Sequence, residues 1–396
     1  MINKYIKNHN EYRNNCLNLV PSENIISDFV KQGYISDLGH RYFFKETYST
    51  STGIVYDYMG AKHIHEMYDE VTALAKRIFQ CEYANIDMHS GHLSNINILL
   101  SFCSFGDSFL CTSPDVGGYP GLCRGKLPKK LGLKPIYFPQ NSVNGKIDLA
   151  VLESLIEKQK PKVAIISSSI TLFPIDLKCL AKLLHEFGIP LVYDGSHPLG
   201  LIAAGKFQKP LDEGADYLIG STHKSFPGPQ GGIILGKNSQ SGIEIKKSTD
   251  FVCVDNIHLH RIAALGLSLH EFEEFGVQYA EQIIKNTQSL SRDLNDNGIN
   301  VRFEEKGFSE SHQLLLDINA NDHARFTSQL EKCNIILDNS GRIGTSEITR
   351  KGLKEVDMKT ISSFICRVFN GDNIEKVKDD VINFLSDHKY LHYVFN

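Results

Sequence analysis

The sequence has no excess of charge of one sign, no closely paired cysteines and no long apolar run. Its 42 basic and 46 acidic residues give a formal net charge of -4. Neither nucleic acid nor an anionic membrane is therefore expected as a partner. The nine cysteines form no Cys-x-x-Cys pair, which argues against zinc knuckles and thioredoxin chemistry. We expect no metal site.

Two further absences concern the location of the protein. The N-terminus is polar and has no apolar signal core. No apolar run is long enough to span a bilayer. An odd number of widely spaced cysteines is typical of reduced thiols. We therefore expect a cytoplasmic protein.

The chain of 396 residues is too long for one small core. Short apolar strands alternate with helical patterns from residue 66 to residue 270, which indicates a mostly parallel sheet covered on both faces. A long helical stretch at 271–296 is followed by short strands and helices, the pattern of a smaller α+β domain. We predict an N-terminal arm at residues 1–65, a large domain at 66–270 and a small C-terminal domain at 271–396.

Two of the predicted strands end at residues that carry chemistry. In open α/β sheets, ligands bind beyond the carboxyl ends of the strands, and Asp194 and Lys224 stand at two such ends. The strands predicted one by one are Ala84–Met88, Ser108–Cys111, Lys162–Ser167, Pro190–Tyr193, Tyr217–Gly220 and Gly232–Leu235.

An amine and a carboxylate in this arrangement match what pyridoxal phosphate requires. Lys224 would form an imine with the aldehyde of the cofactor. Asp194 would pair with the pyridine nitrogen, so that the ring can accept electrons from a carbanion. The alternative interpretation is a surface lysine after a strand and an aspartate that caps a helix.

Other residues could complete a site for this cofactor. Ser90 and Gly91 precede a predicted helix, whose free amides attract phosphate, although Ser90 could simply be an N-cap. Tyr119 could stack on the pyridine ring or belong to a core or turn. Ser169 could reach the phenolic oxygen of the ring or merely end a strand. His197 could lie against the cofactor, orient the aspartate or act as a cap.

Arg342 is a candidate for binding the amino-acid substrate. An arginine fork donates two parallel hydrogen bonds to an α-carboxylate and fixes its orientation. This orientation matters because the bond perpendicular to the imine plane is the one that breaks. The alternative is a surface ion pair.

Five segments of the chain, in order, resemble motifs of the serine hydroxymethyltransferase family. LVPSEN resembles L-I-A-S-E-N, and HSGHLSN resembles H-S-G-S-Q-A-N. VYDGSHPLGLIAAG, STHKSFPGPQGGIIL and SGRIGTSEITRKG resemble the family's aspartate, lysine and arginine motifs. The resemblance extends from about Leu19 to about Glu355. It implies fold type I of the pyridoxal-phosphate enzymes, with a mostly parallel seven-stranded sheet in the large domain.

The resemblance also implies a role for each matching position. Lys224 matches the lysine that holds the cofactor as a Schiff base, and Asp194 matches the partner of the pyridine nitrogen. The family is built on a homodimer with shared active sites, to which the N-terminal arm would contribute. The other implied cofactor contacts are Ser90, Gly91, His92, Tyr119, Ser169, His197 and His223, and the implied substrate contacts are Ser22, Glu23, Tyr42, Tyr58 and Arg342, the two tyrosines coming from the neighbouring subunit.

The sequence departs from the family where tetrahydrofolate is handled. Phe44 stands where the family has a glutamate that moves protons in the folate-dependent step, and about six extra residues follow Tyr42. Glu46 is the nearest carboxylate and Thr50 the other candidate position. A loop of well over ten residues that helps hold the pterin is missing before Arg342.

Four smaller departures accompany these two. Tyr119 replaces a stacking histidine, and His92 replaces a small serine. The segment 254–256 replaces a glycine-rich stretch that reaches the neighbour's phosphate, and Gln230 replaces an arginine. The apparatus for the cofactor and the amino acid is therefore present, whereas the apparatus for folate is damaged.

We hypothesise a folate-independent lyase or transferase that acts on a β-hydroxy or simple α-amino acid such as serine, threonine or glycine. It would cleave the bond between the α- and β-carbons as an aldolase, or pass the fragment to an aldehyde co-substrate as a transaldolase. The base for the substrate hydroxyl is His197, Glu23 or Glu46. The alternatives are a tetrahydrofolate-dependent serine hydroxymethyltransferase, or a racemase, aminotransferase or decarboxylase on the same fold.

Overall fold

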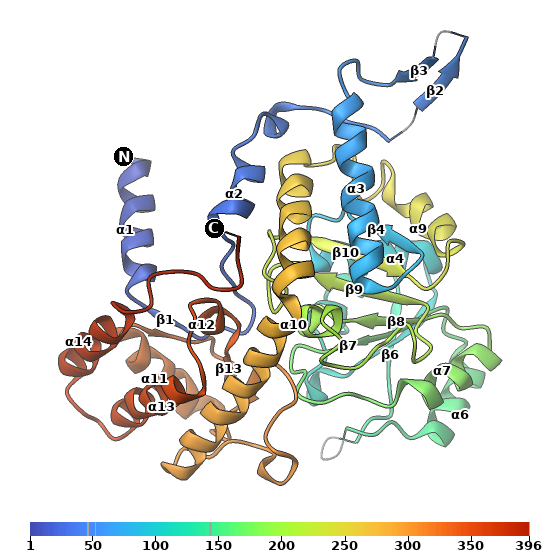
Figure 1. The fold of residues 1–396 in the computed structure, drawn as a ribbon. Helices are drawn as coiled ribbons and strands as arrows, with labels where there is room; N and C mark the ends of the chain where they lie inside the picture. The colour runs from blue at the N-terminus through green and yellow to red at the C-terminus, as the bar shows by residue number, and fades with distance from the viewer. Residues whose placement is uncertain (46, 52, 142–144, 396) are drawn as a thin grey trace. The chain divides into compact units, whose positions relative to one another are not determined.

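The structure is a computed structural model that describes residues 1–45, 47–51, 53–141 and 145–395 (Figure 1). Glu46, one of the three candidate bases, lies outside the described residues. The chain divides into two compact units, one made of Ile26–Glu274 and the other of Met1–Ile25 with Phe275–Phe395. The division into domains made from the sequence stays a prediction.

A seven-stranded sheet forms the centre of the first unit, in the order β4-β10-β9-β8-β7-β5-β6. β10 runs antiparallel to both of its neighbours, and the other pairs are parallel. This confirms the mostly parallel sheet. The strands are β4 (Tyr83–Asn85), β5 (Ser108–Cys111), β6 (Lys134–Tyr137), β7 (Ala164–Ser167), β8 (Leu191–Asp194), β9 (Tyr217–Ser221) and β10 (Gly232–Gly236).

The central strands are apolar because both of their faces are covered. Every residue of β5, β7, β8, β9 and β10 is buried. β6 was not recognised from the sequence, because it is an edge strand that starts with an exposed lysine and a proline. The helices of this unit are α2 (Asp28–Tyr34), α3 (Lys62–Phe79), α4 (Gly91–Phe102), α5 (Leu127–Leu131), α6 (Leu149–Gln159), α7 (Leu177–Glu186), α8 (Leu199–Ala203) and α9 (Ser241–Thr249).

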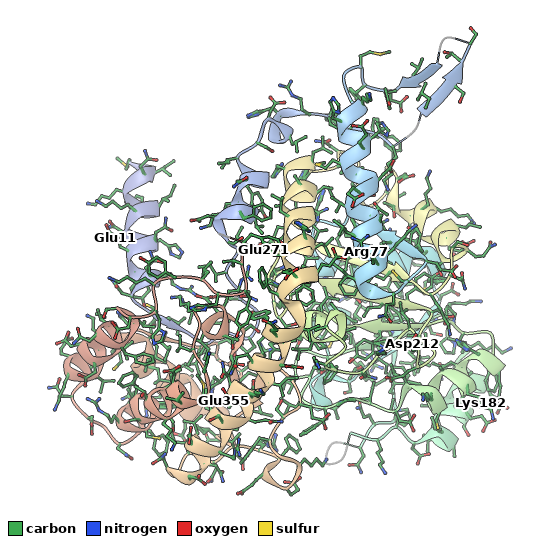
Figure 2. All side chains as sticks on the ribbon, viewed as in Figure 1. Glu11, Arg77, Lys182, Asp212, Glu271 and Glu355 are labelled. Carbon is green, nitrogen blue, oxygen red and sulfur yellow. The ribbon has the colours of Figure 1, made fainter. Side chains whose placement is uncertain are left out.

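The helix α10 (Leu259–Asp296) begins well before the predicted start at residue 271. Its first turns are rich in buried apolar residues on several sides, so they lack the amphipathic pattern that marks a surface helix. α3 and α10 lie side by side (Figure 1), and Arg77 of α3 pairs with Glu273 of α10 at 2.6 Å. Figure 2 shows Glu271 on the same helix, where it accepts a 2.7 Å hydrogen bond from Ser27, the N-cap of α2.

The extra residues between Tyr42 and Tyr58 form an antiparallel hairpin of β2 (Thr47–Thr50) and β3 (Gly53–Tyr56). The hairpin projects away from the sheet (Figure 1). Thr50 donates a hydrogen bond to the carbonyl of Gly53 across the turn. No helix in the described part of the chain is both long and apolar enough to cross a membrane.

The second unit joins the start of the chain to its C-terminal part. β1 (Leu17–Asn18) pairs in parallel with β12 (Ile335–Ile336), and β11 (Gln313–Leu315) pairs antiparallel with β13 (Arg342–Gly344). A buried apolar core lies beneath them and includes Leu19. The helices are α1 (Ile2–Asn14), α11 (Ala320–Lys332), α12 (Ser346–Arg350), α13 (Glu355–Phe369) and α14 (Ile374–Leu385).

Candidate active site

The carboxylate of Asp194 is held at the carboxyl end of β8. The side chain is 7% exposed. One oxygen accepts 2.8 Å hydrogen bonds from the Asn95 amide and the Ser167 hydroxyl. The other accepts from the backbone amide and the hydroxyl of Ser196, at 3.0 and 2.5 Å. The carboxylate is therefore fixed in orientation and does not serve as a helix cap, since the N-cap of α8 is Pro198.

Lys224 and His197 meet near the ends of two neighbouring strands. β8 and β9 run parallel, so the segments that follow them emerge at the same edge of the sheet. The Nζ atom of Lys224 lies 3.1 Å from Nε2 of His197. His197 is buried, whereas Lys224 is half-buried rather than fully exposed as a surface lysine would be. The structure thus places both of these predicted residues in one cluster.

The start of α4 has the geometry of an anion-binding cradle. Ser90 is the N-cap, and its hydroxyl oxygen accepts from the amide of Leu93 at 3.0 Å. The capping interpretation is therefore correct, yet the O–H of Ser90 is still a donor for a ligand. A Cβ atom on Gly91 would lie 2.3 Å from the Ser221 hydroxyl and 2.9 Å from the Ser196 hydroxyl. Only glycine lets these groups approach the helix start so closely.

Tyr119 and Ser169 are brought together beside β7. The amide of Tyr119 donates to the carbonyl of Ser167 at 3.1 Å, and the amide of Ser169 donates to the carbonyl of Gly117 at 2.8 Å. The Tyr119 hydroxyl also lies 3.0 Å from Nδ1 of His92. Burial, and to a lesser degree the negative charge of Asp194, raise the pKa of Tyr119. The tyrosine therefore lies within electrostatic reach of the aspartate.

His223 is a neutral histidine next to Lys224. Burial, helped by the charge of Lys224, lowers the pKa of His223 to about 4. Its Nδ1 atom is buried, and no group in the described part of the chain forms a hydrogen bond with it. A buried polar atom of this kind fits a site that is completed by a ligand.

Three residues that hold Asp194 were not found from the sequence. Asn95 lies one helical turn after Gly91, so both face the sheet, and Ser167 pairs with Asp194 in the register of β7 and β8. Ser196 follows Asp194 by two positions and folds back onto it. The helical spacing was the available signal for Asn95, whereas the others depend on strand register and local turn geometry.

Arg342 begins β13 in the second unit. The amide of Gly344 donates to the carbonyl of Leu19 at 2.8 Å, which brings the LVPSEN segment, with Ser22 and Glu23, to this strand. The Arg342 side chain is 11% exposed and pairs with Asp338 at 2.6 Å. It does form an ion pair, but a largely buried one. Glu23 pairs with Arg13 at 2.5 Å.

Tyr42 and Tyr58 belong to an exposed aromatic cluster in the first unit. Their side chains are 42% and 39% exposed, and their ring centroids are 5.5 Å apart. The Tyr42 hydroxyl donates to Asp255 at 2.8 Å, in the segment that replaces the family's glycine-rich stretch. The ring centroid of Phe44 lies 5.7 Å from that of Tyr58 and 5.3 Å from that of Phe251. The position that the family gives to a glutamate is therefore apolar.

The first unit contains the groups that a phosphorylated pyridine aldehyde requires. A helix start with a close glycine could hold the phosphate, an oriented carboxylate the ring nitrogen, and a lysine amine the aldehyde. Within the described residues, no group of three or more histidine, cysteine or acidic side chains is placed to hold a metal ion.

Comparison with known proteins supports this interpretation of the site. The serine hydroxymethyltransferase family model matches residues 1–365. Serine hydroxymethyltransferases of Methanobrevibacter smithii and Methanothermobacter marburgensis are both 37% identical to this chain. The alignments cover 99% and 100% of this chain, respectively, and 95% of each relative. A solved structure of L-threonine transaldolase from Pseudomonas fluorescens, in its internal aldimine state, superposes with a TM-score of 0.91 at 26% identity, covering 100% of this chain and 93% of that one.

The chain therefore belongs to the serine hydroxymethyltransferase family. It is a pyridoxal-phosphate-dependent enzyme of fold type I, as the sequence predicted. The roles of its individual site residues are part of the proposal that follows.

Proposed function

We propose that this member of the family cleaves the bond between the α- and β-carbons of a β-hydroxy amino acid without tetrahydrofolate. The glycine unit is then released or transferred to another aldehyde. The substrate is of the serine or threonine type. Cleavage gives glycine and an aldehyde, whereas transfer releases the same aldehyde and joins the glycine unit to an acceptor aldehyde as a new β-hydroxy amino acid. Pyridoxal phosphate, when bound, withdraws electrons from the α-carbon so that this bond can break.

Lys224 and Asp194 hold the two ends of the reactive ring system. Lys224 would hold the cofactor through its aldehyde group, and Nε2 of His197, which lies 3.1 Å from the Nζ atom, would take up the proton of the amine. Asp194 would hold the pyridine nitrogen. Two of its four hydrogen bonds come from the hydroxyls of Ser167 and Ser196, which can rotate to admit another donor.

The remaining cofactor contacts come from the same edge of the sheet. Ser90 and Gly91 bind the phosphate at the start of α4, next to His92. Tyr119 would cover one face of the ring, Ser169 would contact its phenolic oxygen, and neutral His223 would line the site without adding charge.

Two residues are assigned to the amino-acid substrate. Arg342 and Ser22 bind the α-carboxylate, because a planar guanidinium matches the two carboxylate oxygens. The base for the substrate hydroxyl is His197, Glu23 or Glu46. Of these, Glu23 is held by Arg13 and His197 by Lys224.

The observation that carries folate independence is the short connection between β12 and β13. Only residues 337–341 join Ile336 to Arg342, and the ion pair of Asp338 with Arg342 closes them into a turn. No chain is left here for a loop that could wrap a pterin. Phe44, in its aromatic cluster, offers no carboxylate for the folate-dependent proton transfer. The transaldolase named above has the same fold over the full chain.

The second candidate is a tetrahydrofolate-dependent serine hydroxymethyltransferase. The relatives that bear this name are more similar in sequence to this chain, at 37% identity, than the transaldolase is, at 26%. This candidate requires that another surface replaces the missing loop.

Glycine formation from L-serine and from L-threonine, with and without tetrahydrofolate, separates the two candidates. The proposal expects the same rate in both conditions. An added acceptor aldehyde should lower the yield of glycine, because the glycine unit is captured in a new β-hydroxy amino acid while the aldehyde of the first substrate is still released. An increase of orders of magnitude with folate would instead identify a hydroxymethyltransferase. Lys224→Ala serves as the blank for reactions that the free cofactor catalyses.

The proposed assembly is a homodimer or a higher oligomer in which Tyr42 and Tyr58 enter the neighbour's site. Their exposure in a single chain, together with exposed Met59, supports this arrangement. Mixing inactive Tyr42→Ala chains with inactive Lys224→Ala chains should restore activity, because one of the mixed sites is then complete. The cytoplasmic location stays a prediction.

A further inference from the structure

The turn before β13 folds a carboxylate onto the guanidinium of Arg342. Oδ2 of Asp338 lies 2.6 Å from Nη2 of Arg342, and Nε of Arg342 donates to the Ser340 hydroxyl at 2.6 Å. The amide of Ser340 donates to Oδ1 of Asp338 at 2.9 Å, and its hydroxyl donates to the same oxygen. Asp338, Ser340 and Arg342 thus form a closed hydrogen-bonded ring.

This ion pair is better shielded from water than comparable pairs of the same unit. The side chains of Arg342 and Asp338 are 11% and 23% exposed. Those of Arg367 and Asp380 are 24% and 40% exposed at 2.8 Å, and those of Arg302 and Asp317 are 53% and 63% exposed at 3.5 Å. Because solvent screens it less, the contact of Arg342 with Asp338 is the stronger one.

The group that Asp338 presents is the same group that an amino acid presents. A side-chain carboxylate and an α-carboxylate seek the same charge-assisted hydrogen bonds from a guanidinium. We propose that Asp338 competes with the substrate α-carboxylate for Arg342 and thereby sets the affinity of the enzyme for amino acids. This inference rests on the role of Arg342 proposed above.

Binding of the amino acid then exchanges one carboxylate for another. The substrate gains its contacts with Arg342 only as those of Asp338 are lost. The net free energy of binding is therefore smaller than it would be for an arginine without a carboxylate partner. The exchange is feasible because Asp338 reaches solvent and the two Ser340 donors can keep hold of Oδ1. The shortened connection that removes the pterin loop is also what brings Asp338 to Arg342.

Equilibrium titration of the holoenzyme with glycine tests the competition. Binding is followed by the absorbance change of the cofactor, which needs no turnover. Asp338→Asn keeps the shape of the side chain but removes its charge, and we expect the Kd for glycine to fall by about 5- to 30-fold. In turnover, KM should fall by a similar factor with little change in kcat.

Asp380→Asn is the control, because it removes one of the two carboxylates that pair with Arg367 in the same unit. Its Kd for glycine should equal that of the unchanged enzyme. Thermal unfolding of each variant verifies that the fold is retained, and Asp338→Ala provides a second removal of the charge. Both Asp338 variants are expected to bind glycine more tightly.

Two results would overturn the competition. An unchanged Kd in both Asp338 variants would mean that the substrate does not displace Asp338. A higher Kd in both variants would mean that Asp338 positions Arg342 for the substrate instead of competing with the substrate.

The variant Arg342→Ala distinguishes a failure of this inference from a failure of the proposed role of Arg342. If that variant binds glycine as tightly as the unchanged enzyme, the carboxylate-binding role of Arg342 is wrong, and the inference about Asp338 fails with it. If it loses glycine binding while Asp338→Asn has no effect, the role of Arg342 stands and only the competition fails.

Discussion

The amine of Lys224 lies 3.1 Å from the imidazole Nε2 of His197, and the two residues follow neighbouring parallel strands. The main chain of His197 is fixed in turn, because its carbonyl accepts a hydrogen bond from the hydroxyl of Ser225. The pair is therefore anchored from both strands, and this rigidity suits a lysine that must present its amine in one direction.

Replacing Lys224 by alanine should abolish the absorbance band of the lysine-linked cofactor and lower kcat/KM by at least about a thousand-fold. The reason is that Lys224 presents its amine beyond the end of β9, 3.1 Å from His197. Lys237→Ala, at an exposed position, should leave both readouts unchanged. Persistence of the band in the Lys224 variant would mean that a different lysine carries the cofactor.

Asp194→Asn should lower kcat/KM by at least about a hundred-fold, because a neutral amide cannot keep the pyridine nitrogen protonated. The amide nitrogen replaces one carboxylate oxygen and cannot accept the two hydrogen bonds donated there, either those of Asn95 and Ser167 or those of Ser196. We therefore expect the free energy of unfolding to fall by about 1–3 kcal/mol. Steady-state kinetics and urea unfolding measure the two effects.

The control for this variant is Asp212→Asn, at an exposed position of the same unit (Figure 2). It should change neither quantity. If Asp194→Asn kept full activity, the carboxylate would have only a structural role.

Gly91→Ala should weaken cofactor binding by about ten-fold or more, because the new methyl group would lie 2.3 Å from the Ser221 hydroxyl and push apart the cradle at the start of α4. The Kd for pyridoxal phosphate, measured by absorbance titration of the apoenzyme, reports this change. Gly39→Ala is a matched control, since its nearest neighbour would be 3.8 Å away in ordinary contact. Equal affinities of the two variants for pyridoxal phosphate would mean that the phosphate does not bind at the start of α4.

His223 should make the enzyme less stable as the pH falls. Burial lowers its folded-state pKa to about 4, whereas an unfolded histidine titrates near 6.5. Between these values the unfolded chain binds more protons, so stability decreases as the pH falls from about 6.5 to about 4 and levels off below. The full effect of this histidine is on the order of 2–3 kcal/mol.

Urea unfolding of the holoenzyme at pH 7.5 and pH 5 measures this dependence. His223→Gln should reduce the difference between the two pH values, whereas His9→Gln, at an exposed position of α1, should leave it as it is. An undiminished difference in His223→Gln would assign the acid sensitivity to other groups.

Much of the site could be predicted because apolar runs mark buried strands and a parallel sheet gathers their carboxyl ends at one edge. Asp194 and Lys224 were found in this way. The partners of Asp194 were not, since strand register and a local turn decide them. The start of α10 was placed too late because its first turns are buried on several sides.

Arg342 shows a different limit of prediction. The sequence left a choice between a surface ion pair and a substrate contact, and the structure shows an ion pair that is only 11% exposed on its arginine side. The partner, Asp338, is four positions away, but the contact depends on a turn that the shortened connection creates. A spacing in the sequence does not specify how such a turn folds.

The pairing of β1 with β12 has a consequence for how the chain is made. Residues such as Asn18 and Glu347, which share a 2.7 Å hydrogen bond, are 329 positions apart. During synthesis, Leu17 and Asn18 cannot pair until residues 335–336 have left the ribosome, whereas Ile26–Glu274 can fold before that. The segment LVPSEN, which we propose to contact the substrate, therefore reaches its folded place only after residues 335–336 have been made.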